Sequence, residues 1–347
     1  MSAATRRSRQ WRSGRLPSRQ RGIALLVAIL LVALGAILAA AIAYESAMTA
    51  RRGAATFAFD DSVLVAEASE ALAAYGLREV LRSNTQHSFY LGQGWDKPVG
   101  PIEVVPEVML TASLEDMQGR FNLNWLVNTD GTPNQQALSA FQQLLSNLGL
   151  EPTWAGYVVD WIDPDSVPQP TDGAEDSVYL GQQPPYLTPN RYITSTTELL
   201  ALPGFGHDRY MKLAPYITAL PQNSALNICT AQGAVLDAFT PGRQEYGVDP
   251  AGLLKNRQSA GACFPTLAEY QQALASSKPQ QPQTTQPGRL GANANGNGNG
   301  VQIGTTSSYF KLTSFVTIGT TEFNLYSLLY QEGSGNVRPI LRSYTPD

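Results

Sequence analysis

The sequence feature that most restricts the fold is an uncharged apolar run at residues 23–43, IALLVAILLVALGAILAAAIA. A helix of these 21 residues is about 30 Å long, which matches the hydrocarbon core of a bilayer. The 22 residues before it contain seven arginines and no acidic residue. Because basic residues beside a membrane span stay in the cytoplasm, we expect a single-pass membrane protein with a cytoplasmic N-terminus and an exported C-terminal part.

A cleaved secretory signal peptide is the main alternative for this run. The apolar core of such a peptide is about 7–15 residues long, which is shorter than residues 23–43. The small residues Ala41 and Ala43 could still form a cleavage site, so both interpretations stay open at this point. They differ in the mature N-terminus, which would be Tyr44 after signal-peptide cleavage.

The junction in front of the run, QRGIALL at residues 20–26, resembles the processing site of type IV prepilins and type II secretion pseudopilins. The resemblance implies that prepilin peptidase cuts between Gly22 and Ile23, that the helix is kept, and that the new amine of Ile23 is methylated. Most members have Glu at the fifth mature position, where this chain has Val27. That absence resembles the K minor pseudopilins, which are tip subunits.

Helical and strand patterns alternate along the rest of the chain. Residues 44–83 contain no proline, and their apolar spacing extends the N-terminal helix from Ile23 to about Ser83. Runs of β-rich or alternating residues predict strands at 102–105, 108–112, 309–318, 322–330 and 336–344. Amphipathic segments predict helices at 134–148, 154–162, 196–202, 207–219 and 266–275.

These elements indicate an α+β fold with a pilin-like long N-terminal helix packed on an antiparallel sheet, and a large inserted α-helical domain. Residues 276–304 are rich in Gln, Pro, Gly and Asn, and we expect a flexible linker there. We therefore divide the chain into a basic leader (1–22), a membrane span (23–43), the rest of the long helix with the first strands (44–124), the inserted domain (125–276), a linker (277–304) and the last strands (305–347).

The strongest candidate for a binding site is residues 160–176, DWIDPDSVPQPTDGAED. This stretch holds six acidic residues and no basic one. Crowded carboxylates repel one another unless a cation lies among them, and calcium takes about 6–8 oxygen ligands from flexible loops. The spacing does not fit an EF-hand. A solvated acidic loop without a metal ion remains the alternative.

Several motifs around this loop resemble the K minor pseudopilin family of type II secretion systems, also called general secretion pathway protein K. They include the acidic stretch itself, DMQGRFNLN at residues 116–124, and ALNICTA at residues 225–231, where Cys229 replaces the usual Asn. By this resemblance the calcium ligands are Asp163, Asp165, Glu175 and Asp176, with carbonyls near Val167. Asp160 and Asp172 are second choices.

The chain has two cysteines, Cys229 and Cys263. If the body of the protein is periplasmic, one disulfide between them is expected to stabilise the fold by about 3–4 kcal/mol. Two buried free thiols are the alternative.

Composition argues against nucleic acid as a partner and against an enzyme. Without the leader, 17 basic residues face 28 acidic ones, a poor match to phosphates. The turn at residues 202–206 resembles a helix-hairpin-helix, but few cations flank it. The two histidines, His87 and His207, show no triad or metal spacing, and we assign no catalytic residue.

The resemblance implies a non-enzymatic minor pseudopilin that caps the periplasmic pseudopilus tip of the type II protein secretion machinery, in the bacterial inner membrane. It implies the minor pseudopilins I and J as partners, with H and the major pseudopilin G as further candidates. The alternatives are a minor pilin of a type IV pilus or DNA-uptake system and a membrane-anchored periplasmic enzyme.

Overall fold

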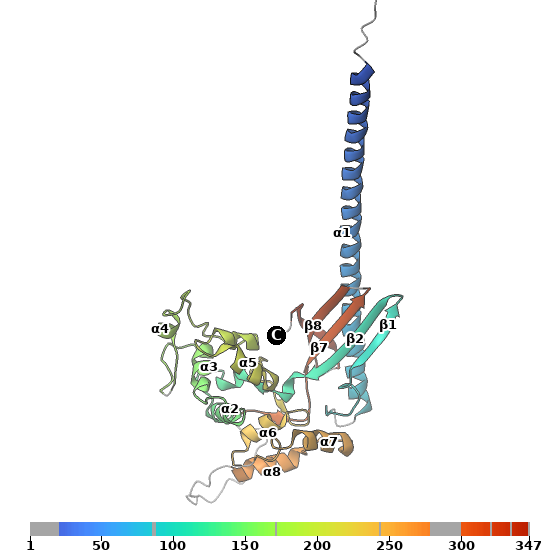
Figure 1. The fold of residues 1–347 in the computed structure, drawn as a ribbon. Helices are drawn as coiled ribbons and strands as arrows, with labels where there is room; N and C mark the ends of the chain where they lie inside the picture. The colour runs from blue at the N-terminus through green and yellow to red at the C-terminus, as the bar shows by residue number, and fades with distance from the viewer. Residues whose placement is uncertain are drawn as a thin grey trace, which may run out of the picture. The chain divides into compact units, whose positions relative to one another are not determined.

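The computed structural model describes residues 21–84, 88–170, 172–242, 244–277, 300–319, 321–333 and 335–345 (Figure 1). Residues 1–20 of the expected leader, His87 and most of the predicted linker lie outside these ranges. The chain divides into two units, Met1–Asp60 and Asp61–Asp347. Helix α1 (Arg21–Ser83) contributes residues to both units, and each unit is described by itself.

The first unit contains the apolar part of α1. Within Ile23–Ser83 the most apolar window has a mean hydropathy of 3.1, and none of that window is buried inside the protein. Large apolar side chains such as Leu26, Leu30 and Ile37 are exposed along it. A single N-terminal apolar helix of this length fits a single-pass membrane anchor.

The second unit is built on a five-stranded antiparallel sheet in the order β1-β2-β7-β8-β9. The strands are β1 (Val99–Val105), β2 (Val108–Asp116), β7 (Tyr309–Ile318), β8 (Thr321–Gln331) and β9 (Val337–Ser343). Burial alternates along β7 and β8, as the period of two in their sequence predicts. Pro106 lies in the short turn between β1 and β2, which is the break that its missing N–H predicts.

The last part of α1 packs one stripe of side chains on this sheet. Leu77 and Ala73 lie in a cluster with Phe310 and Leu329, while Ala66 lies in a second cluster with strand residues. Small alanines let the helix approach the sheet closely, and the polar residues Ser69 and Glu70 are buried beside them. These clusters form the core of the pilin-like part of the unit.

A long insertion separates the neighbouring strands β2 and β7. Their pairing is continuous from Val108 opposite Ile318 to Asp116 opposite Phe310, so the insertion leaves the sheet intact. The insertion has its own core, which includes Phe121, Phe141 and Tyr270. The proposed domain boundaries at residues 124 and 276 stay a prediction.

The insertion is mainly helical, and Figure 1 labels most of its helices. It contains η1 (Met117–Gly119), β3 (Phe121–Asn122), η2 (Leu123–Leu126), α2 (Gln135–Asn147), α3 (Trp154–Ile162), α4 (Asp176–Tyr179), η3 (Thr196–Ala201), α5 (Gly206–Leu213), η4 (Ala214–Tyr216), β4 (Ile217–Thr218), β5 (Leu226–Asn227), α6 (Gly233–Phe239), α7 (Pro250–Ala260), α8 (Leu267–Ser277) and β6 (Ile303–Gly304). Parallel pairs join β3 to β4 and β5 to β6.

Three sequence expectations for the insertion need correction. The helix predicted at 207–219 ends at Leu213, and the chain continues through the short η4, which contains Pro215, into strand β4. The glycine of the motif at residues 116–124, Gly119, suggests from the sequence a turn between short strands, but in the structure it ends the 3₁₀ helix η1. Helices α6 and α7 have no counterpart among the predictions, because α6 is buried nearly all round and α7 buries only Leu253 and Arg257.

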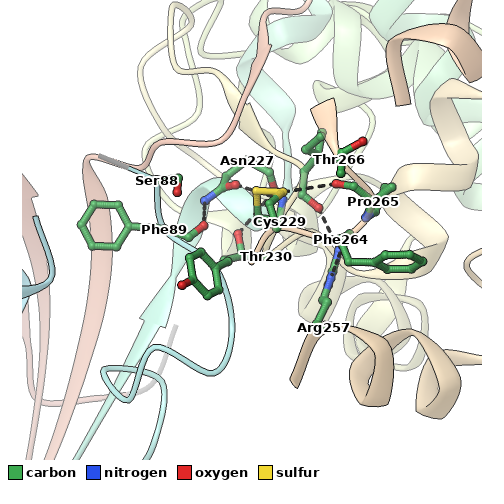
Figure 2. The surroundings of a disulfide bond; sticks show 12 residues. Ser88, Phe89, Asn227, Cys229, Thr230, Arg257, Phe264, Pro265 and Thr266 are labelled. Carbon is green, nitrogen blue, oxygen red and sulfur yellow. Dashed lines mark hydrogen bonds between the residues drawn. A yellow bond between two sulfur atoms is a disulfide. The ribbon is translucent and has the colours of Figure 1, made fainter. Parts of the chain in front are cut away.

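A disulfide joins Cys229 to Cys263, with a Cα–Cα distance of 4.8 Å (Figure 2). It connects the turn after β5 to the segment between α7 and α8. Asn227 lies beside it and donates to the carbonyl of Phe89, which belongs to the segment after α1. The bridge therefore lies where the insertion meets the pilin-like part of the unit.

Candidate functional site

Three carboxylates of the acidic loop converge between the end of α3 and the start of α4. One oxygen from each of Asp160, Asp163 and Glu175 lies within 4.8 Å of the others, and all three residues are buried. Asp160 belongs to the last turn of α3, Asp163 follows that helix, and Glu175 precedes α4. The described residues contain no other such group of acidic, histidine or cysteine side chains.

Asp160 holds the loop in place. Its Oδ2 accepts a hydrogen bond of 2.7 Å from the backbone N–H of Ala174, and its carboxylate also accepts from the N–H of Gln169. A Cβ atom at Gly173 would lie 2.5 Å from Oδ2 of Asp160 and 2.3 Å from the backbone nitrogen of Gln169. Glycine at this position therefore lets the loop fold closely over the carboxylate.

The other two carboxylates each keep one oxygen without a partner. Asp163 Oδ1 and Glu175 Oε1 are buried and accept no hydrogen bond from any residue that the structure describes, and the same holds for Asn190 Oδ1. Asp163 is 0% exposed and Glu175 is 4% exposed. A buried acceptor without a partner costs about 1–3 kcal/mol, and more for a charged group, so these oxygens indicate a ligand that supplies positive charge.

The electrostatics of the cluster agree with this. Burial, followed by the nearby charge of Asp165, raises the pKa of Asp163 to about 7. Burial and the charge of Asp160 raise the pKa of Glu175 to about 7. Burial raises the pKa of Asp160 itself to about 6, although the hydrogen bonds from Gln169 and Ala174 act in the opposite direction. A bound cation would stabilise all three charges.

The structure brings only part of the predicted ligand set together. Asp163 and Glu175 are in the cluster, and Asp160, ranked second from the sequence, joins them. Asp165 is exposed and its Oδ1 accepts from the N–H of Val167, whose side chain is also exposed. Asp176 Oδ1 accepts from the hydroxyl and the N–H of Thr188.

Asn190 is the residue that sequence reasoning missed. It follows the acidic stretch by fourteen positions, and its Nδ2 donates to the carbonyl of Asp165 at 3.2 Å. Its φ of 46° is left-handed, which asparagine tolerates better than most residues. Its place in the family motif was the available signal, but the sequence gives no measure of its distance from the acids.

The oxygen-only chemistry of the cluster favours a hard cation. Carboxylate, amide and carbonyl oxygens suit calcium or magnesium, whereas zinc and copper sites usually contain His or Cys. Calcium accepts irregular sets of oxygens from loops, and magnesium demands a near-octahedral set. Asp160, Asp163 and Glu175, whose oxygens converge, therefore fit calcium.

The turn that resembled a DNA-binding hairpin is a packing element. Phe205 is buried and its ring packs edge-on against Trp154. The nearby cation Arg209 forms an ion pair with Glu151 at 2.8 Å and lies over the ring of Trp154. His207, the other residue weighed for chemistry there, is exposed in the first turn of α5.

The junction expected at the processing site lies at the start of α1. The helix begins at Arg21, so Gly22 and Ile23 are both helical, and the side chain of Ile23 is 63% exposed. Val27 is likewise exposed on the apolar segment.

Comparisons with known proteins bear on the whole chain. A family model described as "Type II secretion system (T2SS), protein K" matches residues 119–222. The chain is 30% identical to type II secretion system protein K of Pseudomonas aeruginosa over 334 residues, which cover 93% of this chain and 92% of that protein. It is 36% identical to type II secretion system protein K of Klebsiella pneumoniae, over 70% of this chain and 77% of that protein.

One solved structure is similar in fold. It is a chain in the crystal structure of the GspK-GspI-GspJ complex from the type 2 secretion system of enterotoxigenic Escherichia coli, with a TM-score of 0.66 and 23% identity. The match covers 85% of this chain and 100% of that chain. The likeness confirms the predicted α+β class, with its long N-terminal helix, antiparallel sheet and inserted helical region.

Proposed function

Because the chain belongs to the type II secretion system protein K family, the K minor pseudopilins, we propose that it caps the tip of a periplasmic pseudopilus. The observation that carries this proposal is the likeness to protein K relatives over 93% of the chain. The action is mechanical: the protein ends a growing fibre and catalyses no reaction.

The insertion between β2 and β7 supplies a physical basis for capping. It leaves the register of the two strands unbroken, so the chain keeps the helix and sheet of a pseudopilin body. It also adds a separately packed helical region to that body. We propose that this added volume hinders the docking of a further subunit above it.

A hydrogen-bonded cluster at Asp116 holds the insertion at the sheet. Asp116 ends β2, and its Oδ2 accepts from Asn227 at 3.0 Å and from Ser307 at 2.6 Å. Its Oδ1 accepts from the N–H of Gln118 at 2.9 Å. Gln118 lies where the chain leaves the sheet, Asn227 lies within the insertion, and Ser307 lies where the chain returns to the sheet. Because one carboxylate joins all three places, the insertion is held firmly at the sheet, as a rigid cap requires.

The N-terminal helix would hold the subunit in the inner membrane until assembly, with the leader in the cytoplasm. Prepilin peptidase would cut between Gly22 and Ile23 and leave the apolar helix in place. The uncharged Val27 fits a terminal position, since an unpaired carboxylate in the membrane costs about 2.5–3.5 kcal/mol or more.

The partners proposed for the chain are the I and J minor pseudopilins, because the similar solved chain is part of a GspK-GspI-GspJ complex. The H and major G pseudopilins are further candidates. We place no interface on individual residues.

Calcium is the proposed structural ion of the acidic loop. We propose that the ion is held by three oxygens that lack a partner among the described residues, Asp163 Oδ1, Glu175 Oε1 and Asn190 Oδ1. The nearby carboxylate of Asp160 would offset part of the ion's positive charge. The ion would supply the positive charge that the crowded carboxylates lack. Asp165 and Asp176 would join the ligand set only if their present hydrogen bonds to Val167 and Thr188 changed.

The direct test of capping uses the bacterium that encodes the chain. Cells with and without the chain are made to overproduce the major pseudopilin, and fibre length is measured by electron microscopy. We expect longer fibres without the chain, and gold-labelled antibodies against it only at fibre ends. Label spaced along the fibres, or fibre length independent of the chain, would contradict the proposal.

The anchor is tested by N-terminal analysis of the protein recovered from membranes. We expect Ile23 at the N-terminus, and a Gly22→Lys variant should retain the leader. Tyr44 at the N-terminus would instead indicate a cleaved signal peptide. Co-purification of the detergent-extracted chain with the I and J pseudopilins of the same cells tests the proposed complex.

A further inference from the structure

The insertion buries a guanidinium group beside the disulfide. Arg257, in the last turn of α7, is 3% exposed. Its Nε donates to the carbonyl of Phe264 at 2.8 Å, and its Nη2 donates to the carbonyl of Ile228 at 2.8 Å. Figure 2 shows it below the bridge, pointing at the Phe264 segment. Ile228 and Phe264 are the chain neighbours of Cys229 and Cys263, so the arginine joins the two bridged segments.

The charge of this guanidinium has no counter-charge in the part of the chain that the structure describes. No ion pair there involves Arg257, and its Nη1 donates to no described residue. Burial lowers the pKa of Arg257 to about 10, and no neighbouring carboxylate acts to raise it. A buried charge is costly unless a partner of opposite sign offsets it, and two carbonyls carry only partial charge.

Arg257 also lines a cavity of about 210 Å³ between α6, α7 and the segment after α1. The cavity wall is largely apolar, with Leu91, Leu253 and Leu254 among its residues. Two polar residues of the wall, Thr230 and Gln232, already donate elsewhere, to Asp116 and to the carbonyl of Pro215. Among the described residues that line this cavity, Arg257 is therefore the one cationic group.

Asp116 does not supply the missing counter-charge of Arg257. Asp116 lines a neighbouring cavity and not this one, and its oxygens accept from Asn227, Thr230 and Ser307. Its hydrogen bonds are made to residues at the junction of sheet and insertion.

We infer that this cavity binds an organic carboxylate, whose head group pairs with Nη1 of Arg257 and whose short apolar body lies against Leu253 and Leu254. One guanidinium matches the single charge of a carboxylate, and Nη1 carries two N–H donors for the carboxylate oxygens. A phosphate dianion would leave charge uncompensated in an apolar wall. The ligand is either a small free acid or the carboxyl terminus of a peptide. The inference stands independently of the capping proposal.

Leu254 provides matched variants, because it is 44% exposed, lines the cavity and lies one helical turn before Arg257. Leu254→Glu places a tethered carboxylate at the cavity mouth, and Leu254→Gln has the same size without the charge. If Arg257 lacks a counter-charge, Leu254→Glu should unfold at a higher temperature than Leu254→Gln. Equal unfolding temperatures would overturn the inference.

Ligand binding is measured on the full chain in detergent by thermal unfolding. We expect butyrate to raise the unfolding temperature above that in sodium chloride of equal ionic strength, with a saturable dependence, and butyramide to have no effect. The rise should be smaller in Leu254→Gln, which loses part of the apolar wall, and should be lost in Leu254→Glu. A leucine-terminated peptide, compared with its amidated form, distinguishes a peptide terminus from a small free acid as the source. No difference between butyrate and chloride, or a larger rise with inorganic phosphate, would overturn the inference.

Discussion

Arg342 on β9 forms a bidentate ion pair with Glu70 on α1, in which Nη2 donates to Oε2 at 2.6 Å and Nε donates to Oε1 at 2.9 Å. Glu70 is 5% exposed and also accepts from the hydroxyl of Ser327 on β8. Because β9 is an edge strand, it pairs with one neighbour only. The Glu70–Arg342 pair therefore ties the last strand to the helix on which the sheet rests.

Replacing Glu70 by Gln should destabilise the folded protein measurably. We expect Glu70→Gln to lower the free energy of unfolding by about 1–3 kcal/mol, because Arg342 loses its buried charged partner and the amide nitrogen of Gln donates where an oxygen of Glu70 accepts. Denaturant unfolding of the full chain in detergent measures this. The matched control is Glu67→Gln, since Glu67 also pairs with Arg342 but is 40% exposed, and its loss should be below about 1 kcal/mol. Equal losses for the two variants would show that burial does not strengthen the pair.

Removing calcium should lower the stability of the insertion. If Asp163 and Glu175 hold the ion, calcium in excess over EDTA should raise the unfolding temperature by several degrees. Asp163→Asn should lose most of this response, because it removes the charge at an unpartnered buried oxygen. Asp208→Asn, in the exposed first turn of α5, is the control and should respond as the parent does. An unfolding temperature unaffected by calcium in the parent chain would argue for the solvated-loop alternative.

The same cluster predicts a pH dependence with a definite sign. The pKa values of Asp163 and Glu175, both about 7, exceed their ordinary values of 3.8 and 4.5. A raised folded-state pKa favours folding below the ordinary value, and this contribution is lost as pH rises through about 7. In EDTA the protein should therefore unfold at a lower temperature at pH 8 than at pH 5.5.

Calcium should reverse part of this loss. Because the ion competes with protons for the same oxygens, its stabilising effect should be larger at pH 8 than at pH 5.5. The comparison uses the same buffers with calcium or EDTA, and Asp163→Asn should show a weaker pH dependence in EDTA. A calcium effect that does not change between the two pH values would contradict the assignment of these two carboxylates.

Regular elements with a strong period were predictable from the sequence. Strand β7 has the predicted bounds, because one face of it is buried along its whole length and its side chains alternate accordingly. Helix α2 was predicted because an apolar stripe runs along it, and the structure adds an N-cap at Asn134. Helix α7 could not be found in this way, because Leu253 and Arg257 are its only buried side chains and they do not form an apolar stripe.

The composition of the carboxylate cluster was predictable from the sequence, but the identity of its members was not. Crowded acidic residues in a proline-rich loop indicated a cation. Which carboxylates remain available to bind it depends on hydrogen bonds between residues far apart in the sequence. The carboxylate of Asp176 accepts a hydrogen bond from the hydroxyl of Thr188, and the side-chain amide of Asn190 donates to the carbonyl of Asp165, 25 positions earlier. No periodic pattern encodes such contacts. Arg257 was missed for the same reason, since its burial depends on the segments joined by the disulfide.

The disulfide should contribute a large share of the stability of the insertion. Its loop spans 34 positions, so its loss should lower the free energy of unfolding by about 3–4 kcal/mol, in a chain-entropy account. The double variant Cys229→Ala, Cys263→Ala tests this by denaturant unfolding. Cys229 is fully buried, so the variant also loses packing, and the parent chain measured with and without reductant separates the two effects. Alkylation of the denatured, non-reduced protein should leave its mass unchanged. Two added alkyl groups would instead identify free thiols, and the reductant should then have no effect on unfolding.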